Sequence, residues 1–272
     1  MLRTFAVAAL LALVARPQDA GPRRPLTEAE RKLIETLAQQ DIALDPARGL
    51  CVVPADVLVR DDLLEYLLVG PAGAAHESAF MTPAAPSVLN VALLALGATP
   101  GTNATWRRKD PAPSEAEVKA GANPYEVTLP TGTGFCLYVG WRQGQETYFY
   151  RVEDLVRNLS SGLAMKRHEW AYLGSRLVPN GRSGADAAEV FAADVYQNLI
   201  NIAFFSEGYT LLSGAQSDCV EQGIWALNAW LLPERGTRVA LVFSRGRIEL
   251  LDAELAARLP EVDGGAASAG GR

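Results

Sequence analysis

His76, Glu77 and Ser78 form the most distinctive polar cluster in this 272-residue chain. A histidine within hydrogen-bond reach of a serine hydroxyl can act as its general base, so one interpretation is a hydrolase site with His76 as base and Ser78 as nucleophile. On a strand, however, alternate side chains point to opposite faces, and Glu77 would point away from the other two. No G-x-S-x-G frame surrounds Ser78 either. We therefore favour a structural role for the cluster, with binding and catalysis as the alternatives.

A metal site is a second kind of chemistry that the composition permits. His168 is the only other histidine, and the two histidines together with Glu77 or Asp194 include residue types that bind zinc. Their spacing resembles no local ligand motif, so we predict neither a metal nor another cofactor. Residues 131–134 read Thr-Gly-Thr-Gly, but a strand pattern follows them, which favours a tight turn over a phosphate loop.

The three cysteines, Cys51, Cys136 and Cys219, lie far apart and form no C-x-x-C pair. Free cysteine is among the most buried residue types, so we expect three small hydrophobic core residues. The alternative is one disulfide bond and one odd thiol, which an oxidising compartment permits.

Several aromatic residues lie in strand-like stretches of the second half. Trp170 and Tyr172 are two positions apart, and Trp225 and Trp230 follow in a later stretch. These rings are candidates for a groove that binds a sugar or a peptide, but period-two spacing is more typical of core positions. We expect core packing, with a binding platform as the alternative.

The N-terminus has the three-part pattern of a secretory signal peptide. Arg3 supplies a positive charge, residues 5–15 are uninterruptedly apolar, and Arg16 ends the run. The run is shorter than the roughly 20 residues that span a bilayer. We therefore expect residues 1–20 to be a signal peptide and the protein to be secreted or periplasmic, whereas an uncleaved segment would leave it anchored at its N-terminus. No later run is long enough to span a membrane.

The rest of the chain divides into three parts. We expect an N-terminal helix and lead-in over residues 21–48, one domain over residues 49–245, and a C-terminal segment with a disordered tail over residues 246–272. The formal net charge is −6, and the one short basic run covers residues 107–109. No nucleic-acid partner is expected, because such binding needs a basic surface.

Strand patterns dominate the predicted domain. Residues 50–69 and residues 135–151 each alternate around a central turn and predict a hairpin. Residues 99–124 are polar and rich in Pro, Ala and Thr, which predicts a long surface loop. The second half holds further strands, and residues 190–205 are especially rich in β-branched and aromatic residues.

Helices are fewer. Thr27 followed by Glu30 is a capping box for a short N-terminal helix. Residues 86–97 begin with Pro, end with Gly and are apolar nearly all round, so we expect a centrally buried helix. Asn90 is its one polar interior residue and should have hydrogen-bond partners, because an unpaired buried amide costs about 1–3 kcal/mol. The predicted fold class is α+β: a mostly antiparallel sheet built from hairpins, with one buried apolar helix and a few short helices.

A series of motifs runs in order along nearly the whole domain. They are LLEYLLV, HES, PSVLNVALLALGATPG, RVEDLVRNLSSGLAM, WAYLGS and LPERGTRVALVF. With these motifs, residues 49–244 resemble the YdjY-domain family, whose members look like exported bacterial proteins. The resemblance implies a name and a compartment but no established reaction. At Asn90 this chain departs from the family pattern, which has a His there, and this departure weakens a histidine-based site.

Two functions of different classes fit these observations. The favoured one is a non-enzymatic binding or interaction module whose partner is a small molecule or a protein outside the cytoplasm. The alternative is a hydrolase-like or metal-assisted enzyme centred on His76, which requires other polar groups to converge with it in one cavity. The groups required are Ser78 and one of His168, Asp194 and Asp218. The candidate binding or structural residues are His76, Glu77, Ser78, Asn90, Trp170, Ser175 and Asp194.

Overall fold

A computed structural model describes residues 25–58, 62–180 and 188–262. The predicted signal peptide over residues 1–20 and the predicted disordered tail after residue 263 lie outside the described residues, so both stay predictions. Within the described ranges, no helix is long and apolar enough to cross a membrane.

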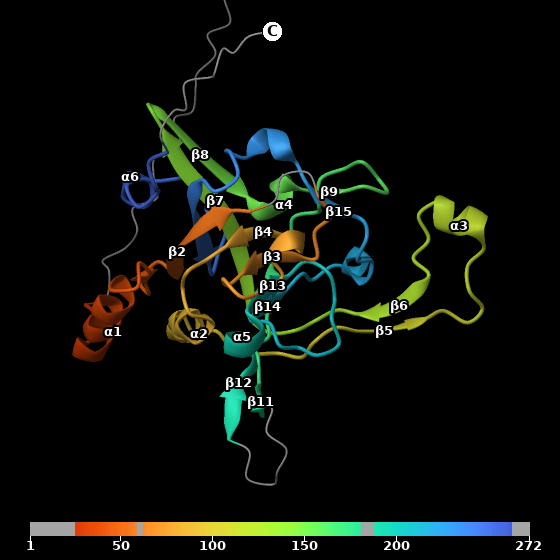
Figure 1. The fold of residues 1–272 in the computed structure, drawn as a ribbon, viewed down its shortest axis with the longest axis horizontal. Coiled ribbons are helices and arrows are strands. Elements are labelled where there is room, and N and C mark those ends of the chain that lie inside the picture. Colours follow the sequence, from red (N-terminus) through yellow and green to blue (C-terminus); the bar gives the residue numbers. More distant parts are fainter. Residues whose placement is uncertain (1–24, 59–61, 181–187, 263–272) are drawn as a thin grey trace, which may run out of the picture.

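Eight strands close into a mixed β-barrel (Figure 1). In order around the barrel they are β2 (Leu50–Val57), β16 (Arg238–Ser244), β7 (Gly134–Gln143), β10 (Trp170–Tyr172), β14 (Leu212–Ser213), β13 (Asn198–Asn201), β3 (Tyr66–Val69) and β4 (Ser78–Met81). The ring closes where β2 pairs with β4, with Val57 opposite Phe80. Two further strands extend the wall: β1 (Ala43–Asp45) pairs with β2, and β8 (Glu146–Arg151) pairs with β7.

This barrel shows that the predicted fold class is wrong. The α+β expectation was a mostly antiparallel sheet of hairpins, but residues 50–69 form no hairpin: β2 pairs with β16 and β4, and β3 pairs with β4 and β13. Two pairings, β3 with β4 and β13 with β14, are parallel. The physical reason is that alternation predicts strands but not their partners, and parallel partners are joined only through longer crossover connections.

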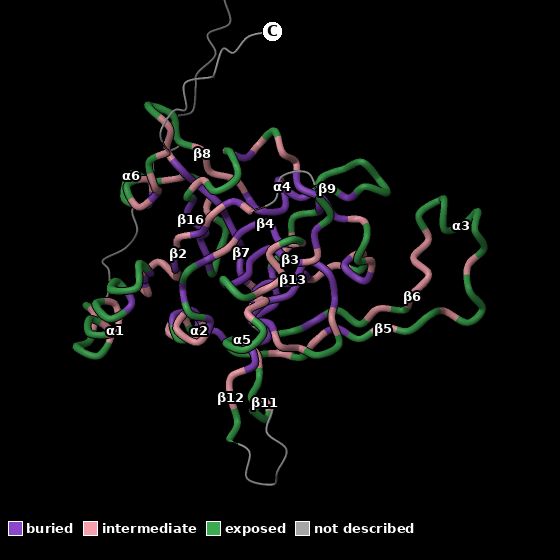
Figure 2. The backbone as a smooth tube through the Cα atoms, in the orientation of Figure 1, coloured by how far each residue is buried: buried purple, intermediate pink, exposed green. Residues whose placement is uncertain are grey.

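The barrel wall is buried on both faces along β2, β7 and β16. In β2, Cys51 and Val53 belong to the inner core, whereas Leu50 and Val52 belong to a second apolar cluster on the other face. The segment that contains α6 (Ala253–Ala256) covers this second cluster. Figure 2 shows the resulting concentration of buried residues at the centre of the molecule. Burial on both faces allows apolar residues at consecutive positions, as in residues 50–53, so the alternation in these strands is incomplete.

The apolar helix α2 (Pro86–Ala95) packs on the barrel with one face only. Leu89 and Leu93 are fully buried, but Val91 and Leu94 are 45% and 46% exposed. The prediction of a centrally buried helix is therefore wrong, because strand side chains already fill the centre of the barrel.

An arm extends away from the barrel (Figure 1). In it, β5 (Thr105–Arg108) pairs with β6 (Tyr125–Thr128), and the chain that connects the two strands contains α3 (Glu115–Lys119). The prediction of one long loop over residues 99–124 is thus wrong in part. A capping box at Ser114 starts the short helix, and pairing with β6 orders the strand.

Two local predictions are confirmed. The helix α1 (Glu28–Ala38) begins with the capping box of Thr27 and Glu30. Residues 135–151 form the hairpin of β7 and β8. The other elements are η1 (Ala75–Glu77), α4 (Val152–Leu155), β9 (Val156–Asn158), β11 (Leu177–Pro179), β12 (Glu189–Phe191), α5 (Ala192–Tyr196), η2 (Ser217–Val220), β15 (Trp225–Leu227) and η3 (Ala229–Leu231).

Candidate functional site

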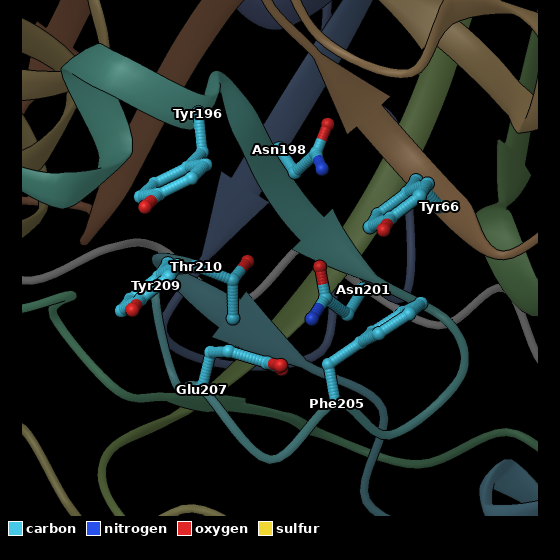
Figure 3. A pocket seen from close by; sticks show the side chains of 8 residues that line it. All are labelled: Tyr66, Tyr196, Asn198, Asn201, Phe205, Glu207, Tyr209 and Thr210. Atoms are coloured by element: carbon cyan, nitrogen blue, oxygen red, sulfur yellow. The ribbon is translucent and has the colours of Figure 1, made fainter.

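A cavity of about 450 Å³ lies beside β3 and β13. We name it the aromatic pocket. Its side chains come from the first residue of β3, the last residue of α5, both ends of β13 and the loop of residues 202–211. Segments far apart in the sequence therefore meet in one site. The lining residues are Tyr66, Tyr196, Asn198, Asn201, Phe205, Glu207, Tyr209 and Thr210 (Figure 3).

Four rings form two stacked pairs on opposite sides of the pocket (Figure 3). The ring centroids of Tyr66 and Phe205 are 5.0 Å apart, and the two planes meet at 6°. The centroids of Tyr196 and Tyr209 are 4.4 Å apart, with an interplanar angle of 12°. An aromatic pair therefore lies on each of two sides of the pocket. Between the pairs lie the polar side chains of Asn201, Glu207 and Thr210.

Hydrogen bonds from two other segments hold the loop that carries four of the lining residues. Asn103 Nδ2 donates to Phe205 O at 2.6 Å, and Ser175 Oγ donates to Tyr209 O at 2.7 Å. Between these two anchors, Gly208 adopts a φ of +65°, a conformation that glycine accepts without strain. The predicted candidate Ser175 therefore acts by positioning the backbone of a pocket residue.

The amide of Asn201 is the unusual polar group of the pocket. The residue is 6% exposed, and its Oδ1 has no hydrogen-bond partner among the described residues. Its polar neighbours are satisfied: Thr210 Oγ1 donates to Leu199 O at 2.6 Å, and Asn198 Oδ1 accepts from Ala74 N at 3.0 Å. An unpaired buried oxygen costs about 1–3 kcal/mol, so a hydrogen-bond donor in the pocket would offset that cost.

Burial and nearby carboxylates shift the ionisation of groups at the pocket. The pKa of Tyr66 is raised to about 12, first by burial and then by three neighbouring carboxylates. The pKa of Tyr196 is also raised, chiefly by the stacked Tyr209. Both phenols therefore stay uncharged at neutral pH. Next to Tyr66, the pKa of Glu65 is raised to about 7 by burial and by a hydrogen bond with Glu77.

The predicted His-Glu-Ser cluster lies in a turn and not on one strand. His76 and Glu77 belong to η1, where His76 Nε2 is 2.5 Å from Glu77 Oε1 and the His76 side chain is 77% exposed. Ser78 begins β4, is fully buried and donates its hydroxyl to Ala74 O at 2.5 Å. The hydroxyl therefore closes the turn. None of the three residues lines the aromatic pocket.

Two other candidate residues link helices to their surroundings. Asn90 Oδ1 accepts from the Tyr172 hydroxyl at 2.5 Å, so this amide has the partner that the sequence predicts. Asp194 Oδ1 accepts from Ser87 N at 2.8 Å. Because Ser87 lies in the first turn of α2, the carboxylate of Asp194 satisfies one of the free N–H groups at the start of that helix.

The candidate Trp170 belongs to a buried polar network. Glu153 Oε1 accepts from Trp170 Nε1 at 3.0 Å and from Arg151 Nη2 at 2.6 Å. The ring of His168 packs against Trp170 with centroids 5.0 Å apart, and burial lowers the pKa of His168. Among the residues that the structure describes, no group of three His, Cys, Asp or Glu side chains is placed to hold a metal ion.

Two other cavities are less suited to a single class of ligand. One of about 660 Å³ is lined by His168, by positively charged Arg side chains and by negatively charged Glu side chains. Another of about 420 Å³ lies between the arm and β9 and includes Asp218. Neither His76 nor Ser78 lines these two cavities. The groups that the enzyme alternative requires therefore do not share one of these cavities, because His168 and Asp218 line different ones.

All three cysteines are buried and unbridged, as expected for small core residues. Burial raises the pKa of Cys51 and of Cys219 to about 12. The pKa of Cys136 is also raised, chiefly by burial. Such thiols stay protonated at neutral pH and are poor nucleophiles.

Sequence patterns miss most of the aromatic pocket. Residues 190–205 read as strand, whereas they contain β12, α5 and β13 in succession. Phe205, Glu207 and Tyr209 alternate along the chain and Gly208 lies among them. This pattern is the one local signal of a loop whose side chains line a pocket. Tyr66 reads as an ordinary strand residue, because only the fold brings it beside Phe205.

Comparison of the chain with protein-family models, with curated proteins and with solved structures finds no match. The resemblance to the YdjY-domain family therefore stays a prediction that rests on the motifs alone. Fold and pocket together define a closed β-barrel with an aromatic cavity beside its wall.

Proposed function

We propose that the protein is a non-enzymatic binding module and that the aromatic pocket is its ligand site. One observation carries the proposal: two stacked ring pairs flank the buried amide of Asn201, whose Oδ1 has no hydrogen-bond partner among the described residues. A volume of about 450 Å³ lies within the usual range for small-molecule sites. Aromatic side chains with a few polar groups between them are also typical of such sites.

Contacts behind the rings support binding, because they order the pocket in advance. Ser175 Oγ accepts from Ala193 N at 3.1 Å and donates to Tyr209 O, which links the loop to α5. The Arg176 guanidinium lies 4.8 Å from the centroid of the Tyr209 ring. Side chains that are already ordered lose little conformational entropy when a ligand binds, so more of the contact energy contributes to affinity.

The enzyme alternative has less support from the geometry. Ser78 is fully buried and its hydroxyl donates to a backbone carbonyl, so His76 is not placed to activate it. The His76 side chain is largely exposed and contacts Glu77. Within the aromatic pocket, Glu207 is the one carboxylate among the lining residues, and the raised pKa values of Tyr66 and Tyr196 keep these two phenols protonated.

A fragment screen by ligand-observed NMR tests the proposal. The wild type is expected to bind a subset of small aromatic and polar fragments, and Tyr196→Ala is expected to lose binding of that subset. Tyr196 is 45% exposed, so its truncation removes one pocket wall without opening the core. The loss should be about tenfold or more in affinity, the size expected when a stacked ring is removed.

Trp230→Ala is the matched control. Trp230 is 94% exposed and does not line the aromatic pocket, so its truncation should leave fragment binding unchanged. Fragments that bind wild type and Tyr196→Ala equally well, or a wild type that binds none, would overturn the proposal.

A further inference from the structure

The lining of the aromatic pocket carries negative charge and no positive charge. Glu207 is its one ionisable group other than the tyrosines, and none of the eight lining residues is Lys, Arg or His. The carboxylates of Glu65, Glu77 and Glu207 all lie near enough to Tyr66 to raise its pKa. The electrostatic potential in the pocket therefore favours a positively charged occupant.

The ring walls favour the same sign of charge. The face of an aromatic ring is the negative part of its quadrupole and attracts a cation, by about 0.5–1 kcal/mol at exposed sites and more where water is excluded. Tyr209 has no face left for a ligand, because one face is stacked on Tyr196 and the Arg176 guanidinium lies over the ring, 4.8 Å from its centroid. Tyr66, Phe205 and Tyr196 each keep one face that is not stacked on the partner ring of the pair. Arg176 does not line the pocket, and the pair of Tyr66 and Phe205 has no cation–ring contact among the described residues.

The unpaired Oδ1 of Asn201 adds a requirement for hydrogen bonding. This oxygen is an acceptor, so its partner in an occupied pocket must be an O–H or N–H group. A neutral sugar could donate hydrogen bonds to both Asn201 and Glu207 but would bring no charge to balance the carboxylate. A simple alkyl cation would use the charge but leave Asn201 unpaired.

We infer that the aromatic pocket binds a small organic cation that also carries an O–H or N–H donor. In this arrangement the cationic group lies beside Glu207, its counter-charge, and against an unstacked ring face, and the donor reaches Asn201. The inference rests on the proposed function and adds the chemical class of the ligand.

Choline and dimethylbutanol, its uncharged carbon isostere, provide the test. The two compounds share shape and hydroxyl group and differ in charge, so titration of each into the full chain isolates the charge. We expect choline to bind at least about tenfold more tightly. Raising the salt concentration should weaken choline binding and leave the isostere unaffected, because salt screens exposed charges.

Glu207→Gln is the variant that tests the counter-charge. It should lower the affinity for choline about fivefold or more and leave the affinity for dimethylbutanol unchanged. Glu115→Gln is the control, because Glu115 is an exposed carboxylate of α3 in the arm and does not line the pocket. This control should bind choline as the wild type does.

The outcomes separate this inference from the proposed function. Equal binding of choline and its isostere, binding of neither, or unchanged choline affinity in Glu207→Gln would refute the cation. If neutral fragments still bind and are lost in Tyr196→Ala, the pocket remains a ligand site for an uncharged molecule. If no fragment depends on Tyr196, the proposed function fails as well.

Discussion

Replacing Glu153 with Gln tests how strongly the buried polar network supports the barrel. Glu153 is fully buried, and both of its oxygens accept from Arg151, at 2.6 Å from Nη2 and 2.9 Å from Nε. Oε1 also accepts from Trp170 Nε1 at 3.0 Å. The substitution keeps the size of the side chain but removes its charge, and its amide turns one acceptor into a donor that faces a guanidinium.

The expected loss of stability is large because Arg151 is itself only 8% exposed. Breaking a buried ion pair by removing one partner costs about 3–5 kcal/mol, since the remaining charge is left uncompensated. We expect Glu153→Gln to lower the free energy of unfolding by about 3 kcal/mol. Urea denaturation measures this value, and an unchanged slope shows that the same surface is exposed on unfolding.

Two controls identify the cause. Asp154→Asn removes the charge from a surface pair with Arg167, in which Arg167 Nη2 lies 2.6 Å from Asp154 Oδ2, and should cost less than about 1 kcal/mol. The double variant Arg151→Met, Glu153→Leu should recover part of the loss, because no buried charge remains although Trp170 Nε1 loses its acceptor. A Glu153→Gln protein as stable as Asp154→Asn would refute the reasoning.

Three further predictions concern single positions. Burial and Glu77 raise the pKa of Glu65 to about 7, so the protonated carboxyl stabilises the fold. This contribution to the free energy of unfolding is fully present below about pH 4 and is lost as the pH rises through 7. It amounts to about 1 kcal/mol once solvent screening is included. Urea denaturation at pH 5 and pH 8 should show this fall in the wild type and not in Glu65→Gln. Asp194→Ala removes the acceptor for Ser87 N and should cost about 1 kcal/mol in thermal unfolding, whereas Asp194→Asn should cost less. Gly132 has a φ of +117° and a Cβ there would lie 2.2 Å from a carbonyl oxygen, so Gly132→Ala should cost about 3 kcal/mol or more in the same assay.

Local structure could be predicted where neighbours in the sequence decide it. The capping box of Thr27 and Glu30 forms because both partners lie within one helical turn. The hairpin of residues 135–151 forms because the two strands are joined by a short turn and need no other segment to align them.

Barrel closure could not be predicted, because it depends on pairings between distant segments. β2 and β3 alternate like hairpin strands, but Val57 pairs with Phe80 and Tyr66 pairs with Ser78 and Asn201. Nothing in the local pattern distinguishes these partners. The same limit applies to α2, whose apolar residues suggest the centre of a domain although one side of the helix meets solvent.

The candidate residues were predicted as binding or structural positions, with hydrogen-bond partners expected for Asn90, and the aromatic pocket was not predicted. Asn90 has a hydrogen-bond partner in the Tyr172 hydroxyl, and Ser175 holds the backbone of Tyr209. Polar residues within apolar stretches draw attention in a sequence, whereas Tyr66 does not, because aromatic residues are common in strands. The pocket arises only when β3 and the loop after β13 are brought together.

The position of β16 in the barrel constrains how the chain can fold during synthesis. β16 lies between β2 and β7 and pairs with both, although it is the last barrel strand in the sequence. The ribosome therefore releases β2 and β7 long before the strand that joins them. Until residue 244 has emerged, both strands have an unpaired edge and an apolar face in water, so the nascent chain is most prone to aggregation in this interval.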